Sequence, residues 1–390
     1  MGIPVESPRG RVALMIAHCA GMVDLVALSV WVGALIVHYG MDAQQAGGLP
    51  TLFLSGAVLA SVVLAPRFHR VPGRRVASAG FGISALAFWL AAGTTTYAGL
   101  VVLHAAAGLA SGAALSVTHG TIARSTNPHR LFAIVGVALG VFAVLFLGIT
   151  PQLIAAFGGT ALFHTFAGVM ALGALASALA FPSVEPLSSS AMRLQSRPAP
   201  LPKVIWLGIA GIASMTLVQA MIFSFLEGAG LYRGFGQRAI NGVLIALGLV
   251  NLLPAALAAL LQKRIAARNV LLVGPLVQVA LAAAIMLSPV FGLYAAAASM
   301  FAAVMIFTHT FAFGLLARLD ESGRALAATP AMLMTGSAIG PFLGGTLVTL
   351  SGYASLAVAA ACLGMIATFC FYRLPSATAA VAAPRVALQS

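Results

Sequence analysis

Charged side chains are scarce in this sequence of 390 residues. Asp, Glu, Lys and Arg make up 7% of it, whereas 61% of the residues are hydrophobic. A soluble protein carries roughly a quarter charged residues, so a soluble globular fold is excluded. The apolar residues form continuous runs, each long enough to cross a hydrocarbon layer about 30 Å thick. These runs lack the alternation of a membrane β-barrel, and they therefore predict an all-α polytopic membrane protein.

Common catalytic and cofactor motifs are missing as well. The two lysines, Lys203 and Lys263, do not follow a glycine, so the sequence holds no P-loop for a nucleotide phosphate. There is no HExxH or CxxC motif, and the three cysteines stand singly within apolar runs. We therefore expect no metal site, no cofactor and no enzymatic activity. A solute that is moved uphill must then draw its energy from an ion gradient or the membrane potential.

The apolar runs predict twelve transmembrane helices in two equal halves. A polar, proline-rich segment, 182–203, is expected to be a cytoplasmic linker between an N-terminal bundle, 1–181, and a C-terminal bundle with a short tail, 204–390. The predicted spans are roughly 12–38, 47–66, 76–92, 98–122, 131–150 and 160–181 in the first half, and 204–230, 239–261, 270–287, 292–317, 326–350 and 354–373 in the second.

The distribution of basic residues predicts the orientation. Of the 20 Lys and Arg residues, only Arg233 and Arg238 fall in loops on the side opposite the termini. Basic loops stay in the cytoplasm, so both termini are expected there. The expected location is the inner membrane of a bacterium. The net charge of +13 follows from the same bias and does not indicate a nucleic-acid partner.

The two halves match each other at an offset of 194 residues. Both copies have the same orientation because each contains an even number of spans. The offset joins four arginine pairs in predicted cytoplasmic loops and four glycine pairs at helix ends or turns. These pairs are Arg70/Arg264, Arg74/Arg268, Arg124/Arg318, Arg130/Arg324, Gly40/Gly234, Gly48/Gly242, Gly80/Gly274 and Gly158/Gly352.

Two parallel six-helix repeats joined by a basic linker resemble the major facilitator superfamily of secondary transporters. After span 2 the family usually has Gly-x-x-x-Asp-Arg-x-Gly-Arg-Arg, and here PRFHRVPGRR keeps Gly73, Arg74 and Arg75. Pro66 stands in place of the first glycine and Arg70 in place of the aspartate. The resemblance therefore implies the family fold, without the charge lock that the aspartate makes.

A second motif lies in predicted span 11. The stretch GSAIGPFLGG looks like a pattern of family exporters, which carry it in span 5 or in the symmetry-related span 11. Glycines spaced by four residues give a flat face for helix packing, and proline disturbs the backbone ladder. Small residues also pack helices in any polytopic protein, and the pairs Gly108/Gly112 and Gly136/Gly140 are expected to do so. The candidate packing or gating residues are Gly336, Gly340, Pro341, Gly344 and Gly345.

Asp24 is the candidate proton-coupling residue of the first half. It lies near the middle of span 1, where an ionised carboxylate costs about 2.5–3.5 kcal/mol. Such a group must face a cavity, meet a partner or be protonated. The alternative is a structural carboxylate bonded to neighbouring helices. The resemblance implies that spans 1, 4, 7 and 10 line the transport cavity, which favours the functional interpretation.

Further candidates lie on spans 4, 7 and 10. Glu227, towards the outer end of span 7, is interpreted either as a second proton or substrate site or as an ion-pair partner of Arg233. His309 lies at the depth of Asp24, and imidazole suits a proton relay, although most buried histidines are structural. The candidate cavity residues are Trp31, His104, Ser111, Gln219, Phe223 and Thr308. His18 is expected to be a packing residue.

These features favour a proton-coupled secondary transporter. No Lys or Arg lies in the interior of a span, so a small neutral, zwitterionic or cationic substrate is expected. Export by proton antiport is favoured, and import by proton symport or a non-transporting membrane receptor are the alternatives. The expected partners are this substrate, protons and the lipid bilayer, with the protein acting as a monomer.

Overall fold

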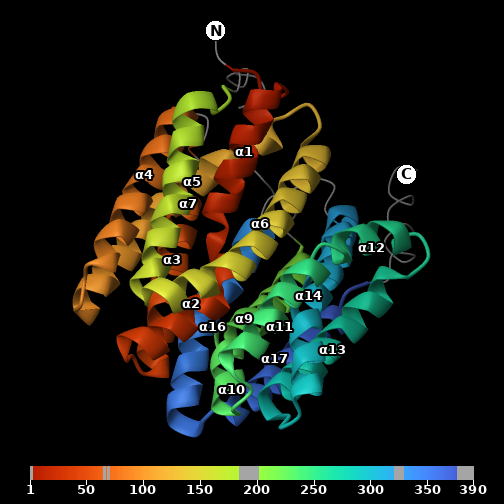
Figure 1. Ribbon diagram of the computed structural model, residues 1–390. Helices are drawn as coiled ribbons and strands as arrows, with labels where there is room; N and C mark the ends of the chain where they lie inside the picture. The colour runs from red at the N-terminus through yellow and green to blue at the C-terminus, as the bar shows by residue number, and fades with distance from the viewer. Residues whose placement is uncertain (1–2, 65–66, 68–70, 184–201, 320–328, 376–390) are drawn as a thin grey trace, which may run out of the picture. The chain divides into compact units, whose positions relative to one another are not determined.

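The computed structural model describes residues 3–64, 67, 71–183, 202–319 and 329–375 (Figure 1). Within these residues every regular element is helical. Twelve stretches are long and apolar enough to cross a membrane, and they confirm the twelve predicted spans. The first stretch, Pro8–Tyr39, consists of two helices rather than one.

The chain divides into two compact units. The first contains Met1–Pro198 and Pro341–Thr349, and the second contains Ala199–Gly340 and Leu350–Ser390. The predicted domain boundaries, at residues 181 and 204, stay a prediction. The helices of the N-terminal half are α1 (Pro8–Gly21), α2 (Val23–Tyr39), α3 (Ala43–Leu64), α4 (Gly73–Ala92), α5 (Tyr97–Ala123), α6 (Pro128–Phe157) and α7 (Thr160–Ala180). Those of the C-terminal half are α9 (Lys203–Ser224), α10 (Leu226–Tyr232), α11 (Gln237–Val250), α12 (Pro254–Leu261), α13 (Ala267–Leu287), α14 (Phe291–Leu319), α16 (Thr329–Ser351) and α17 (Ala354–Tyr372).

Prolines mark helix ends less reliably here than the sequence suggests. Span 5 was expected to end at Thr150, before Pro151, but α6 continues through Pro151 to Phe157. Proline is tolerated inside membrane helices because neighbouring helices and local adjustments satisfy the freed backbone groups. Span 8, predicted at 239–261, is divided between α11 and α12, and Pro254 begins the second helix. The predicted end of span 5 was therefore wrong, whereas the predicted bounds of span 8 agree within a few residues with the stretch Gln237–Ala258.

Aromatic rings fill the interior of the first unit. Trp31 of α2 is fully buried, and its ring lies 4.6–5.9 Å, between centroids, from four other rings. Three of these four contacts are edge-to-face, an arrangement that stabilises a core beyond the burial of area. The four neighbours of Trp31 come from α3, α4, α5 and α7, and they are Phe53, Phe88, His104 and Phe166.

Glycines of α5 let its backbone touch α3. A Cβ atom added at Gly108 would lie 2.0 Å from the carbonyl oxygen of Phe53, and one at Gly112 would lie 2.3 Å from the Cα of Ala57. This contact confirms the packing predicted for the pair. Gly136 of α6 differs, because a Cβ there would meet no described atom within 4 Å. The packing role predicted for Gly136 was therefore wrong.

The internal repeat is visible in backbone geometry. Gly40 and Gly234 have φ angles of +63° and +77°, and Gly158 and Gly352 have φ angles of +81° and +73°. Residues with a side chain rarely adopt such angles, so glycine is required at both members of each pair. Packing repeats as well. A Cβ at Gly80 would meet Ala114, and one at Gly274 would meet Thr308, which lies 194 residues after Ala114.

A pair of matched arginines performs the same task in each unit. Arg74, in the first turn of α4, donates through Nε to the carbonyl oxygen of Ala178, near the end of α7, over 2.8 Å. Arg268, at the start of α13, donates to the carbonyl oxygens of Tyr372 and Leu374, where α17 ends, over 3.3 and 2.9 Å. Cations at a helix C-terminus satisfy unpaired carbonyl groups and oppose the helix dipole.

This geometry predicts a small stability effect. Replacing Arg74 or Arg268 by glutamine should lower the free energy of unfolding by about 0.3–1 kcal/mol each, because the terminal carbonyl groups lose a cationic donor. Arg75, the exposed neighbour of Arg74, provides the matched control. Thermal unfolding of the purified variants in detergent should rank both lower than Arg75→Gln. Equal midpoints for all three would show that these contacts contribute nothing.

Candidate functional site

The first membrane span is broken at Met22. α1 ends at Gly21 and α2 begins at Val23, with Met22 between them at φ −111° and ψ 19°. Gly21 lies against α5 so closely that an added Cβ would be 2.6 Å from Leu115. The combination of a glycine with low helix propensity and a residue in the bridge region ends one helix and starts the next.

Asp24 occupies the first turn of the new helix. Asp24 is 1% exposed, and its Oδ1 atom has no hydrogen-bond partner among the described residues. The first N–H groups of a helix have no partner within that helix, and the positive end of the helix dipole lies there. A carboxylate at this position is therefore stabilised by α2 while it remains shielded from water.

The second unit has a break of the same kind. α9 ends at Ser224 and α10 begins at Leu226, with Phe225 between them at φ −108° and ψ 9°. The Ser224 hydroxyl donates to the carbonyl oxygen of Ala220 over 2.7 Å, a bond that tends to bend helices. Glu227 comes two residues after Phe225, just as Asp24 comes two residues after Met22. Glu227 is 7% exposed.

The two acids therefore share a local setting but not a repeat position. The residue 194 positions after Asp24 is Val218, whereas Glu227 lies 203 positions after it. The second break thus comes nine residues later in its repeat than the first.

Glu227 has a polar partner on the next helix. Its Oε1 accepts a hydrogen bond of 2.7 Å from Nε2 of Gln237, and Oε2 has no partner among the described residues. Nε2 of Gln237 also donates to Oδ1 of Asn241 over 3.0 Å. The structure gives Arg233 other partners, because its guanidinium donates to the carbonyl oxygens of Ile285 and Met286 at the end of α13. The ion pair considered for Glu227 and Arg233 is not formed.

Two tyrosines lie against α10 at its glycines. A Cβ at Gly228 would be 2.7 Å from the hydroxyl of Tyr353, and one at Gly230 would be 2.8 Å from the hydroxyl of Tyr294. The Tyr294 hydroxyl donates to the carbonyl oxygen of Leu226 over 2.8 Å. Burial lowers the pKa of the Arg233 guanidinium. The nearby tyrosines act in the opposite direction; they are Tyr294, Tyr232 and Tyr353. Both tyrosine hydroxyls can approach the helix that carries Glu227 because Gly228 and Gly230 lack a side chain.

The contact between Glu227 and Gln237 supports a second prediction. Replacing Gln237 by leucine should lower the free energy of unfolding by about 1–3 kcal/mol, because a buried carboxylate loses its donor. Gln152→Leu is the matched control, since Gln152 is exposed like Gln237 but donates only to the carbonyl oxygen of Gly148 in its own helix. Thermal unfolding in detergent compares the two, and an equal loss in both would contradict a supporting role for Gln237.

The predicted cavity residues of the first half lie in the unit's interior. Trp31 belongs to the aromatic cluster described above. His104 is fully buried, and its Nδ1 lies 2.7 Å from the carbonyl oxygen of Leu100, one turn earlier in α5. Ser111 is 1% exposed. This geometry favours packing for Trp31 and His104, and contact of the three with a substrate stays a prediction.

The predicted cavity residues of the second half are Thr308, Gln219 and Phe223, and their surroundings differ. Thr308 is buried against Gly274 and bonds the carbonyl oxygen of Val304 in its own helix. Gln278 of α13 is buried, and its Nε2 donates to Oε1 of Gln219 in α9 over 3.4 Å. The same nitrogen donates to the carbonyl oxygen of Met215 over 3.1 Å. Phe223 is 4% exposed, one turn before Glu227. These two glutamines therefore connect α9 and α13.

The histidines differ in the partners that the structure gives them. His309 is half-buried, its ring faces Phe313 at 5.0 Å between centroids, and Nδ1 has no partner among the described residues. His18 of α1 was expected to pack only, yet its Nδ1 lies 3.0 Å from Nε2 of His119 of α5. The two are separated by 101 residues, so no local pattern signals this pair.

The span 11 motif contributes to helix packing in the second unit. A Cβ at Gly336 would lie 2.2 Å from the carbonyl oxygen of Ala213, and one at Gly340 would lie 2.8 Å from the backbone nitrogen of Met221, both in α9. Pro341, Gly344 and Gly345 are buried and belong to the segment assigned to the first unit.

Of the predicted loop residues, Gly73 packs next to Phe181, Arg74 caps α7, and Arg75 is exposed. Arg70 lies outside the described residues.

Comparison with known proteins agrees with this architecture. Three solved structures share the fold over 94–96% of this chain and 97–98% of their own, at 14–15% sequence identity. They are a D-xylose-proton symporter with a TM-score of 0.74, a bacterial homologue of the human lysosomal transporter Spinster with 0.67, and the nucleoside transporter NupG with 0.65. No curated protein sequence matches the chain. A sequence profile of the Major Facilitator Superfamily matches residues 14–319, and the chain therefore belongs to this family of membrane transporters.

Proposed function

We propose that this transporter is coupled to protons and exports a small organic solute by antiport, with Asp24 as the proton-binding group. The observation that carries the proposal is the setting of Asp24: a fully buried carboxyl group that follows a helix break and has one oxygen without a described partner. Ionisable groups within membrane spans commonly mark ion pathways, and broken helices commonly form coupling sites in transporters.

The break allows Asp24 to exist in both protonation states. When protonated, the group is neutral and compatible with its apolar surroundings. When ionised, it benefits from the free N–H groups and the positive dipole end of α2. A carboxyl group that tolerates both states can release its proton on one side of the membrane and bind one on the other. In an antiporter the substrate would occupy the site while the proton is absent.

The charge pattern supports the proposed substrate class. Within the described spans, Lys and Arg occur only near the ends, whereas Asp24 lies in the interior of its span. An anionic substrate normally requires a cationic partner, commonly arginine. A neutral, zwitterionic or cationic solute is therefore the better match. We also propose that both termini lie in the cytoplasm, as the basic loops indicate. The proposal includes a monomer in a bacterial inner membrane.

Import by proton symport is the second candidate. The observation in its favour is the shared fold with the D-xylose-proton symporter, although a likeness at 15% identity speaks for fold alone. A receptor without transport activity is the third, and membership of a transporter family argues against it.

Inside-out vesicles with an imposed proton gradient separate these candidates. Vesicles containing the protein are screened with labelled organic solutes while a dye reports the internal pH. Proton release that accompanies solute accumulation supports antiport and export. Movement of solute and protons in the same direction contradicts antiport and supports symport. Absence of any protein-dependent movement across a broad screen contradicts transport and supports the receptor.

A further inference from the structure

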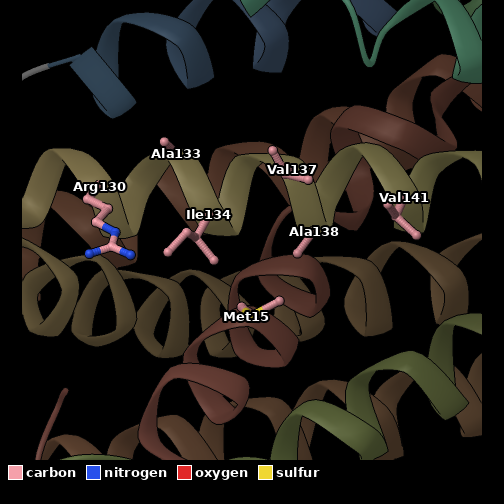
Figure 2. Close-up of a pocket in the computed structure, with 7 residues that line it drawn as sticks. All are labelled: Met15, Arg130, Ala133, Ile134, Val137, Ala138 and Val141. Carbon is pink, nitrogen blue, oxygen red and sulfur yellow. The ribbon is translucent and has the colours of Figure 1, made fainter. Parts of the chain in front are cut away.

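An apolar groove runs along one face of α6 in the first unit (Figure 2). Its volume is about 540 Å³, within the range of pockets that hold small molecules. Met15 of α1 closes one side, and Arg130 of α6 lies at one end. The remaining lining residues are Ala133, Ile134, Val137, Ala138 and Val141.

The groove has the dimensions of a hydrocarbon chain. From Arg130 to Val141, α6 rises roughly 16 Å, at 1.5 Å per residue. The wall between these residues consists of methyl and methylene groups, which offer no hydrogen bonds to a polar solute. Beyond Val141 the same face continues with Leu145 and Ile149, which are 55% and 52% exposed. A chain longer than the groove can therefore continue along the helix.

Arg130 supplies a single positive charge at the end of this wall. It is exposed in the first turn of α6, where its backbone N–H is capped by Oδ1 of Asn127 over 3.1 Å. The guanidinium makes no hydrogen bond or ion pair within the described part of the chain. Glu6, an acid bonded to the loop before α6, is already engaged by Arg11 and Thr126. The charge of Arg130 is therefore available to a ligand.

We infer that this groove is a binding site for an anionic phospholipid, with the phosphate at Arg130 and one acyl chain along α6. Arginine binds phosphate through parallel N–H donors, and exposed basic residues at the membrane surface attract anionic headgroups. The position of Arg130, at the first turn of a membrane-spanning helix, is where a headgroup lies when its chain follows the helix. The inference stands apart from the proposed proton coupling, because Asp24 does not line the groove.

Native mass spectrometry of the purified full-length protein tests the site. Delipidated protein is mixed with phosphatidylglycerol or phosphatidylcholine with the same chains, and bound lipid is counted. Wild-type protein should retain more phosphatidylglycerol. Arg130→Gln should lower its binding roughly fivefold, whereas Arg130→Lys should keep most of it. Arg264→Gln, an exposed loop arginine of the other unit, should have no effect. Ala138→Phe, which fills the groove, should lower the binding of both lipids.

Two results would overturn the inference. One is phosphatidylglycerol binding that is the same in wild type, Arg130→Gln and Ala138→Phe. The other is binding of dodecyl phosphate that depends on Arg130 while phosphatidylglycerol does not bind, which would assign the groove to a free amphiphilic anion. Each variant is first compared with wild type by thermal unfolding, and Arg130→Lys reports on the site even if Arg130→Gln folds poorly. Neither result depends on proton transport.

Discussion

Replacing Asp24 by asparagine should leave a protein that inserts and folds but no longer accumulates its solute against a gradient. Asparagine has nearly the same size and keeps a polar group at the start of α2, so the packing around this position should change little. It cannot release or bind a proton in the physiological range, however, and the energy of the proton gradient is then lost. Solute accumulation in energised vesicles should fall to the level of protein-free vesicles.

The control for this variant is Asp42→Asn. Asp42 is an exposed acid between α2 and α3, and its Oδ1 accepts a hydrogen bond from the backbone nitrogen of Gln45 over 2.8 Å. Uphill transport should survive this change because no proton passes through the group. Downhill exchange of labelled solute should persist in Asp24→Asn if the site still binds. Uphill transport at the wild-type level in Asp24→Asn would reduce Asp24 to a structural carboxyl group.

Replacing Gly108 by alanine should destabilise the first unit strongly. The added methyl group would lie 2.0 Å from the carbonyl oxygen of Phe53 and 2.7 Å from its Cα, and both belong to the backbone of α3. A backbone cannot move aside as a flexible side chain can, so α3 and α5 must separate along their contact. Overpacking of this kind typically costs about 1–3 kcal/mol, and the upper part of that range is expected.

Gly136→Ala provides the matched comparison. Gly136 also lies inside a membrane-spanning helix, but its added methyl group would meet no described atom within 4 Å. Alanine favours helix more than glycine, so this variant should be as stable as wild type or slightly more so. Thermal unfolding in detergent, followed by size-exclusion chromatography, measures both. Equal stability of the two variants would contradict the close contact between α3 and α5.

The sequence predicted the twelve spans because apolar length is a direct physical requirement of the bilayer. It also predicted the repeat, and the structure shows why the glycine matches were meaningful: Gly40, Gly158 and their partners hold positive φ angles. The role of Arg74 was not predictable from the pattern alone. Its acceptor, Ala178, lies 104 residues away, and any residue can supply a carbonyl group.

The helix breaks at Met22 and Phe225 were not predicted, because a hydropathy pattern does not distinguish a broken helix from a continuous one. Both lie within apolar runs, and neither is marked by proline. A weak signal was present, since acids favour the first turn of a helix. Asp24 and Glu227 could therefore have been interpreted as helix starts as well as buried charges. The repeat offset of 194 residues did not reveal the similarity of the two acids, because Glu227 lies nine positions after the residue that matches Asp24.

Infrared difference spectroscopy tests the central claim most directly, because it needs no knowledge of the substrate. The protein, reconstituted in lipid, is measured as the pH is stepped through the neutral range. Only seven Asp and Glu residues contribute, so the carbonyl stretch of a protonated carboxyl group is easily assigned. We expect a band that titrates in wild type and in Glu227→Gln, and that disappears in Asp24→Asn. An unchanged band in Asp24→Asn would contradict the assignment of Asp24 as the proton-binding group.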